Sequence, residues 1–412
     1  MASSLGSKVK TARSSPSEFE GEAFKVIPHP GSEQLVIFPT GTGAGRTGGF
    51  DFWASGNELP VNRIFINSGS RIEWYQGGIP GLGDDLAGVL RTLSDWARYL
   101  GTKEILAIGQ SMGAAGAILY GTQLGARVLA CSPETTIKLP GSRSEKLMHP
   151  TAPVRFPDLH DFIRQAKKPV TVFAGERDPI DLYCMSLAKN LPNYHGRTMR
   201  RVIHGVPNYL KNRGRLRSFL ETFIAGEQIP PMQEDGNALD HPDFARDYYA
   251  LHVASFREDW DSAIDIGRKL VSNNAWSDHA HYLLGRAYLK TGNYDEALRM
   301  FAVASAILPS EGEYRFYVGH CFRHLGDNDL AISTHRRSIR DGVGTAKTHF
   351  DLCIIYSKAG LYKRALTEIS KAVKLAPDNE AFRARETRVR AQIKSSGLPD
   401  NPEAARLRLV YG

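Results

Sequence analysis

A serine at position 111 stands at the junction between a strand-like and a helix-like stretch. The residues before it (EILAIG, 104–109) favour a strand, and those after it (112–125) are small helix formers. Gly109 and Gly113 lie two residues before and two residues after the serine. A sharp strand-to-helix turn exposes the serine hydroxyl and leaves no room for side chains at these two positions. Such a serine can act as a nucleophile if a general base and an oxyanion-binding site lie nearby.

An acid and a base that could activate this serine follow later in the chain. Asp178 comes after the strand-like stretch VTVFAG in a Gly-x-x-Asp arrangement, and Asp181 is the reserve candidate. His204 ends the strand-like stretch MRRVIH, whereas His195 competes from a turn before it. In a triad, the histidine takes the serine proton and the aspartate orients the imidazolium. The structural alternatives are a helix-capping role for either aspartate and a surface position for His204.

The stretch Gly109-Gln110-Ser111-Met112-Gly113 resembles the nucleophile elbow of the α/β-hydrolase family. The chain order of serine, acid and histidine is also that of the family. The resemblance covers roughly residues 30–225 and implies a triad of Ser111, Asp178 and His204 that works through an acyl-enzyme. The alternative is an ordinary glycine-rich turn.

The resemblance also implies an oxyanion hole made of two backbone N–H groups. Met112, directly after the serine, is expected to give one of them. The other is expected from the loop TGTGAGRTGG, where Thr42 is the first choice and Gly43 the second. This loop carries Thr40-Gly41-Thr42 where the common signature has His-Gly. No G-K-[ST] follows the loop, so the sequence disfavours a phosphate-binding loop.

Two further segments bear on substrates and partners. Arg71, Trp74 and Tyr75 follow a strand end on the edge that carries the serine, so they are candidate substrate-binding residues, with packing under the loop as the alternative. The segment 189–217 contains no acid. Its basic residues are Lys189, Arg197, Arg200, Arg201, Lys211, Arg213, Arg215 and Arg217. They indicate either a solvated helix face or a site for an anionic ligand or partner. Nucleic acid is not expected, because no recognised binding fold or interleaved aromatic residues are present.

The elements that must position these residues alternate between strand and helix patterns. Near-continuous apolar runs (34–39, 62–67, 104–109, 127–132, 170–175 and 199–204) are typical of strands buried on both faces. Helix-like stretches between them, notably 85–101 and 112–125, predict a mostly parallel, doubly wound α/β sheet.

The C-terminal half repeats every 34 residues. Small residues recur at Ala263, Ala297, Ala331 and Ala365, and the stretch LLGRAYLKTGNYDEALRMFAVASAILP resembles the tetratricopeptide (TPR) consensus. The resemblance implies an all-α solenoid of about four repeats with a polar capping helix. Four aromatic residues also recur at this interval, namely Tyr248, Tyr282, Phe316 and Phe350. They predict an aromatic row in a groove that docks a protein partner, with packing between helices as the alternative.

Composition and domain boundaries complete the expectations. The 412 residues, 42% hydrophobic and 23% charged with net charge +8, are typical of a soluble protein of two or three domains. The predicted divisions are a tail (1–24), the hydrolase-like domain (25–225), a linker (226–243), the TPR domain (244–395) and a second tail (396–412). No apolar run approaches the ~18 residues of a membrane span. The N-terminus lacks the apolar core of a secretory signal. Four scattered cysteines disfavour disulfides and zinc sites. We expect no cofactor, no metal and a cytoplasmic location.

These patterns lead to two functional hypotheses. The first is a serine esterase or acyltransferase that acts on an ester, with the O-acyl groups of a polysaccharide suggested by similar domain combinations. The second is a catalytically inert hydrolase fold that serves, with its repeats, as an interaction scaffold. Peptidase activity on the same triad has no dedicated support.

Overall fold

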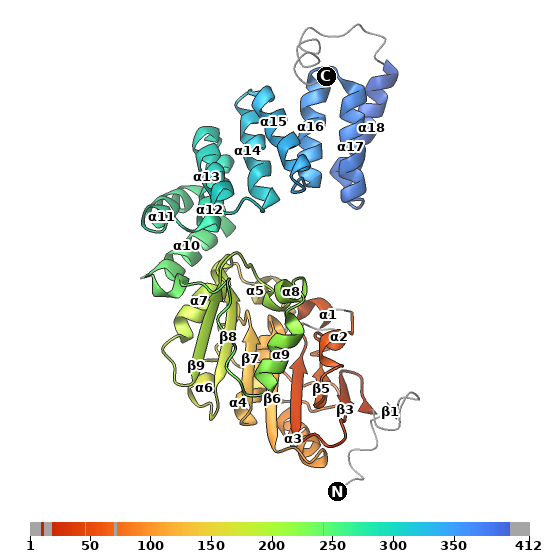
Figure 1. The fold of residues 1–412 in the computed structure, drawn as a ribbon, viewed down its shortest axis with the longest axis vertical. Coiled ribbons are helices and arrows are strands. Elements are labelled where there is room, and N and C mark those ends of the chain that lie inside the picture. The colour runs from red at the N-terminus through yellow and green to blue at the C-terminus, as the bar shows by residue number, and fades with distance from the viewer. Residues whose placement is uncertain (1–9, 12–18, 46, 70–71, 242, 396–412) are drawn as a thin grey trace. The chain divides into compact units, whose positions relative to one another are not determined.

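The computed structural model describes residues 10–11, 19–45, 47–69, 72–241 and 243–395. The chain divides into two compact units, Met1–Tyr249 and Ala250–Gly412. The first unit is built on a sheet with helices on both faces, and the second consists of helices, as Figure 1 shows.

The sheet of the first unit is mixed, with parallel strands throughout its larger part. Its nine described strands lie in the order β1-β2-β3-β5-β4-β6-β7-β8-β9. Their bounds are β1 Lys10–Thr11, β2 Phe19–Glu20, β3 Phe24–Ile27, β4 Gln34–Pro39, β5 Asn62–Ile66, β6 Glu104–Gln110, β7 Arg127–Cys131, β8 Val170–Gly175 and β9 Tyr194–Met199. The pairs from β5 through β9 are parallel, and β1, β2 and β3 add antiparallel pairs at one edge. The predicted parallel sheet is therefore present, and the antiparallel edge is an addition that the sequence patterns did not predict.

The last strand lies earlier in the chain than its predicted position. The expected strand was 199–204, whereas β9 ends at Met199. His195 therefore lies on the strand itself, and His204 lies in the loop after it. The loop ends at Gly205, whose φ of 109° turns the chain into the next helix.

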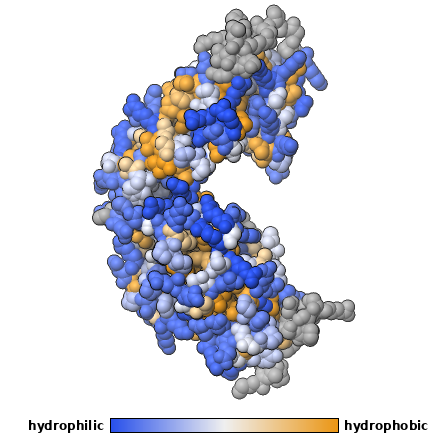
Figure 2. Space-filling model, in the orientation of Figure 1, coloured by the Kyte–Doolittle hydropathy of each residue, from blue (hydrophilic) through white to orange (hydrophobic). Residues whose placement is uncertain are grey.

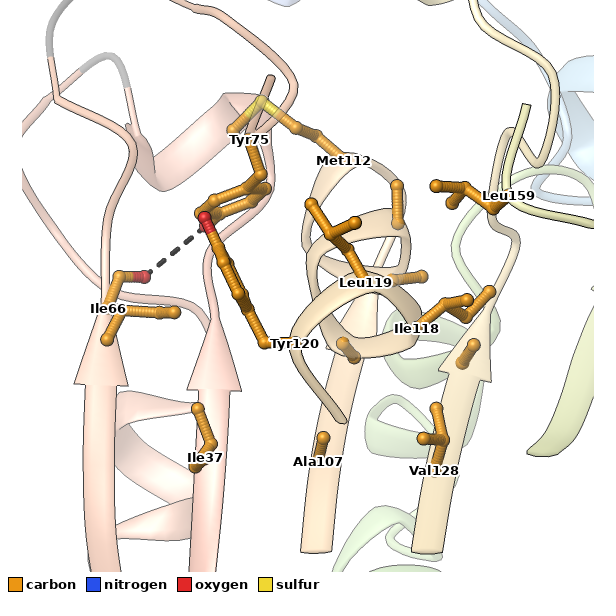
Figure 3. Packing of buried hydrophobic residues seen from close by; sticks show 14 of the residues in the cluster. Ile37, Ile66, Tyr75, Ala107, Met112, Ile118, Leu119, Tyr120, Val128 and Leu159 are labelled. Atoms are coloured by element: carbon orange, nitrogen blue, oxygen red, sulfur yellow. Dashed lines mark hydrogen bonds between the residues drawn. The ribbon is translucent and has the colours of Figure 1, made fainter. Parts of the chain in front are cut away.

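Side chains alternate along the central strands and fill a core on each face of the sheet. Leu35 and Ile37 of β4 belong to one apolar cluster, and Val36 and Phe38 belong to the other. The first cluster is covered by α3, α4 and α6, and the second by α8 and α9. Figure 3 shows the first face, where side chains of α4 lie over Ile37 and its neighbours on adjacent strands. The helices of this unit are α1 Thr42–Gly45, α2 Trp53–Gly56, α3 Leu86–Tyr99, α4 Met112–Gln123, α5 Arg143–Leu147, α6 His160–Arg164, α7 Pro179–Ala188, α8 Val206–Lys211, α9 Leu216–Ile224 and the short 3₁₀ helix Ala238–Asp240.

The order of the strands decides where the loops meet. β4 is flanked by β5 on one side and by β6 on the other. The chain therefore adds β5 on one side of β4 and then crosses to the other side of β4 to add β6. In such sheets, a crevice forms outside the carboxyl ends of the strands at the reversal point. The loop after β4 and the turn after β6, which carries Ser111, meet at this crevice.

The segment predicted as a linker (226–243) is packed against the sheet. Asp235 forms a bridge with Met199 at the end of β9, and the Arg200 N–H donates to the Glu234 carbonyl at 2.7 Å. The Ala238 N–H donates to the buried carboxylate of Glu176 at 2.7 Å. The linker prediction was wrong, because these contacts make the segment part of the α/β unit.

The second unit is a solenoid of helical pairs. Its helices follow α10 (Phe244–Phe256), which crosses the division between the units. They are α11 Trp260–Asn273, α12 Asp278–Lys290, α13 Tyr294–Ile307, α14 Gly312–His324, α15 Asn328–Arg340, α16 Ala346–Lys358, α17 Tyr362–Leu375 and α18 Glu380–Ser395. The small residues of the repeat allow close packing: a Cβ on Gly285 would lie 2.9 Å from the Phe301 ring. On the face drawn in Figure 2, hydrophilic side chains cover most of the surface. Within the described part of the chain, no helix is long and apolar enough to cross a membrane.

The predicted aromatic row in a groove was wrong. Tyr248, Tyr282 and Phe316 are 0%, 7% and 6% exposed, so none of these three rings lines an open groove. Phe350 is half-buried and packs on Phe382 with ring centroids 5.0 Å apart. The spacing of 34 residues shows that the four residues occupy equivalent positions in successive repeats. It does not tell whether that position is buried or exposed, and in this structure it is buried or half-buried.

Replacing one of these rings is expected to lower the stability of the helical unit. Tyr282 contacts Tyr314 and Phe301 at centroid distances of 5.1 and 6.0 Å. We expect Tyr282→Ala to lower the free energy of unfolding by about 3–5 kcal/mol, as for other buried aromatic residues. Val303→Ala, on an exposed face of α13, is the control and is expected to change it by about 0.5 kcal/mol or less. Urea denaturation of both variants checks this, and equal losses would mean that Tyr282 does not belong to the core.

Candidate active site

Ser111 occupies a strained turn between β6 and α4. Its φ of 56° and ψ of −123° are unusual for a residue with a side chain. The turn is held by the Ser111 N–H, which donates to the Cys131 carbonyl of β7 at 2.9 Å. A Cβ on Gly109 would lie 2.1 Å from the Gly113 carbonyl oxygen, and a Cβ on Gly113 would lie 2.2 Å from that of Pro39. Glycine is therefore required at both positions, for the steric reason that the sequence pattern indicated.

A methyl group at position 113 is expected to destabilise the α/β unit. In an ordinary helix, Gly→Ala stabilises by up to about 1 kcal/mol. Here the contact with the Pro39 backbone reverses the sign, and we expect a loss of at least about 3 kcal/mol. Gly43→Ala is the matched control, since a Cβ there meets nothing within 4 Å. Thermal unfolding distinguishes the two, and a Gly113→Ala protein as stable as the control would contradict the described turn.

The acid that contacts His204 is Asp181, not Asp178. Nδ1 of His204 lies 3.1 and 3.0 Å from the two carboxylate oxygens of Asp181, which is fully buried. Because a carboxylate can only accept, Nδ1 carries the proton and donates it. This arrangement leaves Nε2 as the basic nitrogen.

Asp178 serves a different purpose, so the choice of Asp178 as the orienting acid was wrong. Its carboxylate caps α7 by accepting the N–H groups of Ile180 and Asp181 at 3.1 and 3.0 Å. Its other oxygen lies 2.5 Å from the guanidinium of Arg143. Burial works against its ionised form, but the charge of Arg143 outweighs burial and holds the pKa of Asp178 below its usual range.

His204 is only 16% exposed, and its surroundings favour the protonated form. Burial alone lowers the pKa of an imidazole, but the charge and hydrogen bond of Asp181 outweigh burial, so the pKa of His204 is raised. Its Nε2 has no hydrogen-bond partner among the described residues, and no hydrogen bond joins it to the Ser111 hydroxyl. The base and the nucleophile thus line one cavity without being hydrogen-bonded to each other.

This cavity has a volume of about 640 Å³. Ser111, Arg143 and His204 line it together with the loop after β4. Its remaining walls include Phe50, Asp51, Phe52, Trp53, Leu147, Pro207, Lys211 and Leu216. Lys211, exposed at this wall, has no ion-pair partner among the described residues. The cavity therefore combines an aromatic wall with one unpaired cation.

Two N–H groups of the loop after β4 already donate hydrogen bonds to side chains. The Thr40 N–H donates to the Tyr75 hydroxyl, and the Gly41 N–H donates to the Asp51 carboxylate, each at 2.7 Å. The N–H groups of Met112 and Thr42 have no hydrogen-bond acceptor in the described part of the chain. Both residues begin a helix beside Ser111, α4 and α1 respectively, so both remain candidates for the oxyanion hole.

Two of the three residues predicted to bind substrate do not line the cavity. Trp74 and Tyr75 are each 1% exposed. The Tyr75 hydroxyl holds the loop after β4 by accepting the Thr40 N–H and donating to the Thr40 carbonyl at 2.8 Å (its contact with Ile66 is drawn in Figure 3). The substrate-binding prediction for these two was wrong, because they pack under the loop. Arg71 lies outside the described residues.

Four of the eight basic residues in segment 189–217 pair with acids that lie outside this segment. Arg197 pairs with Asp235 and Arg215 with Glu234, each at 2.7 Å. Arg217 pairs with Glu58 at 2.7 Å and with Glu221 at 2.9 Å. The interpretation as uncompensated charge was therefore wrong for these arginines, since the former linker supplies two of these acids and Glu58 and Glu221 supply the others. An anionic ligand at this segment remains a prediction.

The spacing of Asp178, Asp181 and His204 could also hold a metal ion, because their ligand atoms lie within 4.8 Å of one another. Arg143 already contacts both carboxylates, at 2.5 and 3.6 Å. We therefore assign the cation of this cluster to Arg143 and not to a metal.

Comparison with known proteins identifies the class of the C-terminal half. The sequence model of the tetratricopeptide repeat family matches residues 257–315. The C-terminal half of the chain thus carries a TPR array, in agreement with its helical pairs.

Individual relatives match only part of the chain. Superkiller protein 3 of Schizosaccharomyces pombe is 28% identical over 121 residues, which are 28% of this chain and 8% of that protein. Human Protein O-mannosyl-transferase TMTC1 is 32% identical over 94 residues, 23% of this chain and 11% of that protein. This chain spans only about a tenth of the length of these relatives. Among solved structures, a thermophilic TPR protein of Thermus thermophilus is 18% identical with a TM-score of 0.32, covering 45% of this chain and 96% of its own. MamA is 15% identical with a TM-score of 0.32, covering 41% and 94%.

Proposed function

We propose that the α/β unit is a serine hydrolase or acyltransferase of the α/β-hydrolase type. Ser111 is the nucleophile, His204 the general base and Asp181 the acid that orients it. The observation that carries the proposal is the strained turn of Ser111, which opens onto the same cavity as a histidine bound to a buried aspartate. The position of each residue after its strand supports it further, in the order serine, acid and histidine.

The proposed reaction uses these groups in sequence. Nε2 of His204 takes the hydroxyl proton as Oγ of Ser111 attacks the carbonyl carbon of an ester. The N–H groups of Met112 and Thr42 stabilise the oxyanion of the tetrahedral intermediate, and each such donor contributes about 3 kcal/mol. The imidazolium then protonates the leaving alcohol, and the acyl-enzyme remains. Water or a second alcohol, deprotonated by His204, releases the acyl group.

The walls of the cavity support an ester with an apolar acyl group as the substrate. Phe50, Phe52 and Trp53 offer apolar surface for an acyl chain, and the volume of about 640 Å³ leaves room for a bulky alcohol part. We propose an O-acyl ester, and similar domain combinations suggest the O-acyl groups of a polysaccharide as one candidate. TPR arrays are protein-interaction modules, so we propose that the helical unit docks a protein partner.

A second candidate function is an inert scaffold. The missing hydrogen bond between Ser111 and His204 and the unusual loop Thr40-Gly41-Thr42 favour it. In catalytic sites without substrate, this hydrogen bond is often long, and an assay of ester hydrolysis distinguishes the two functions.

A panel of acyl esters of graded chain length tests the proposal. Full-length protein is expected to hydrolyse short esters, with kcat/KM rising as pH increases through the raised pKa of His204, because only the neutral imidazole accepts the serine proton. The acid limb is therefore expected above the pH of about 6.5 typical of free histidine. Folded protein that cleaves no ester across the range from weakly acidic to weakly alkaline pH would favour the scaffold.

A further inference from the structure

Arg143 is a charged group in the cavity that neither the triad nor the oxyanion hole uses. It lies in the connection between β7 and β8, at the start of α5. Its backbone is fixed by the buried Glu134, which accepts the N–H groups of Arg143 and Ser144 at 2.8 and 3.0 Å. Its side chain is 28% exposed and lines the cavity with Ser111 and His204. The backbone of Arg143 is therefore fixed by Glu134, and its side chain reaches the cavity.

The guanidinium connects the two aspartates of α7. Nη2 lies 2.5 Å from Asp178, and Nη1 lies 3.6 Å from Oδ1 of Asp181. The same Oδ1 lies 3.1 Å from Nδ1 of His204. Asp178 is in turn fixed as the cap of α7, so it anchors the guanidinium. The result is a continuous chain of charges, Asp178–Arg143–Asp181–His204, in which the sign alternates when His204 is protonated.

The position of Arg143 reduces the repulsion between the carboxylates of Asp178 and Asp181. Two buried carboxylates whose oxygens lie within 4.8 Å of each other repel, and the positive charge of Arg143 offsets this repulsion. Without Arg143, the two carboxylates would stabilise the imidazolium more strongly and make His204 a poorer base at neutral pH. Arg143 counteracts this effect of both carboxylates on His204.

We infer that Arg143 is a positioning residue for the proposed reaction, which bridges Asp178 and Asp181 beside His204 and keeps His204 available as a base near neutral pH. This inference rests on the proposed function. The charged and titratable groups around His204 are Asp178 and Asp181 of α7, Arg143 of α5, Lys211 of α8 and, across the cavity, Asp51. Of these, Arg143 opposes protonation of His204 whereas both aspartates of α7 promote it, which agrees with the directions of their effects on the pKa of His204.

The test compares Arg143→Met with Arg143→Lys in the full chain. NMR titration of the His204 imidazole, assigned by its loss in His204→Asn, is expected to show a midpoint at higher pH in Arg143→Met and a smaller change in Arg143→Lys, which keeps the charge. The acid limb of kcat/KM is expected to move in the same direction, with about a tenfold loss at about pH 6 and a KM within about twofold of the wild type. Arg164→Met, which breaks only an exposed ion pair with Asp161, is the matched control and should change neither.

The outcomes separate the inference from the proposed function. An unmoved His204 midpoint in folded Arg143→Met protein would overturn the inference even if the wild type is an active esterase. An effect confined to KM would also overturn it, because Arg143 would then bind substrate. Wild-type protein without esterase activity would remove the proposed function, whereas the titration would still report the effect of Arg143 on His204. If Arg143→Met does not fold, the neutral but polar Arg143→Gln takes its place: a His204 midpoint at higher pH supports the inference, and an unmoved midpoint overturns it.

Discussion

Replacing Ser111 by alanine is expected to lower the kcat for ester hydrolysis by about 10⁴–10⁶-fold, because no other group can form the acyl-enzyme. The protein should remain folded, since the serine hydroxyl makes no hydrogen bond that the turn requires. The strained φ of 56° is a backbone property that alanine must also adopt, so a modest loss of stability is expected. His204→Ala should lower kcat by a similar factor, because the two residues act as a unit. A Ser111→Ala enzyme with more than about a hundredth of wild-type activity would exclude Ser111 as the nucleophile.

The two aspartates of α7 are expected to differ strongly. Asp181→Asn removes the acceptor that fixes the tautomer of His204, and such a change lowers kcat by about 10⁴-fold in serine enzymes with this triad. Asp178→Asn keeps an oxygen that can cap α7 but loses the ion pair with Arg143, so we expect a loss of about tenfold or less. Each variant is the control for the other, because both remove one negative charge from the same turn of the chain. A larger loss in Asp178→Asn would restore Asp178 as the orienting acid.

Residues close together in the chain could be placed from the sequence, and the turn around Ser111 is the best example. A strand pattern, two glycines and a run of small helix formers all act locally, and the Cβ positions at Gly109 and Gly113 show why no other residue fits. The parallel strands followed from their apolar runs. The antiparallel edge did not, because its strands are short and lie near the N-terminus without a clear alternation.

The choice between Asp178 and Asp181 could have been made from a local signal. Asp178 directly precedes Pro179, and an aspartate before a proline at the first helical position is a typical helix N-cap. That pattern assigns Asp178 to the cap and leaves Asp181, one turn into the helix, free to reach His204. The Gly-x-x-Asp spacing was a weaker guide than the capping chemistry.

Contacts between distant segments could not be predicted. Arg143 meets Asp178 from 35 residues away, and no pattern around it indicates a role. Glu234 and Asp235 pair with Arg215 and Arg197 from a stretch whose composition is typical of a linker. The inward orientation of Tyr282 and its equivalents also depends on packing, since periodicity identifies equivalent positions without assigning the face.

The most direct test of the central claim is covalent labelling of the full-length protein with a fluorophosphonate, followed by peptide mapping. An activated serine attacks phosphorus, displaces fluoride and keeps the phosphonyl group. The account predicts one adduct per chain, located on Ser111, with labelling about 100-fold slower or more in His204→Ala. Folded wild-type protein that gains no adduct, or that carries it on a different residue, would contradict the account.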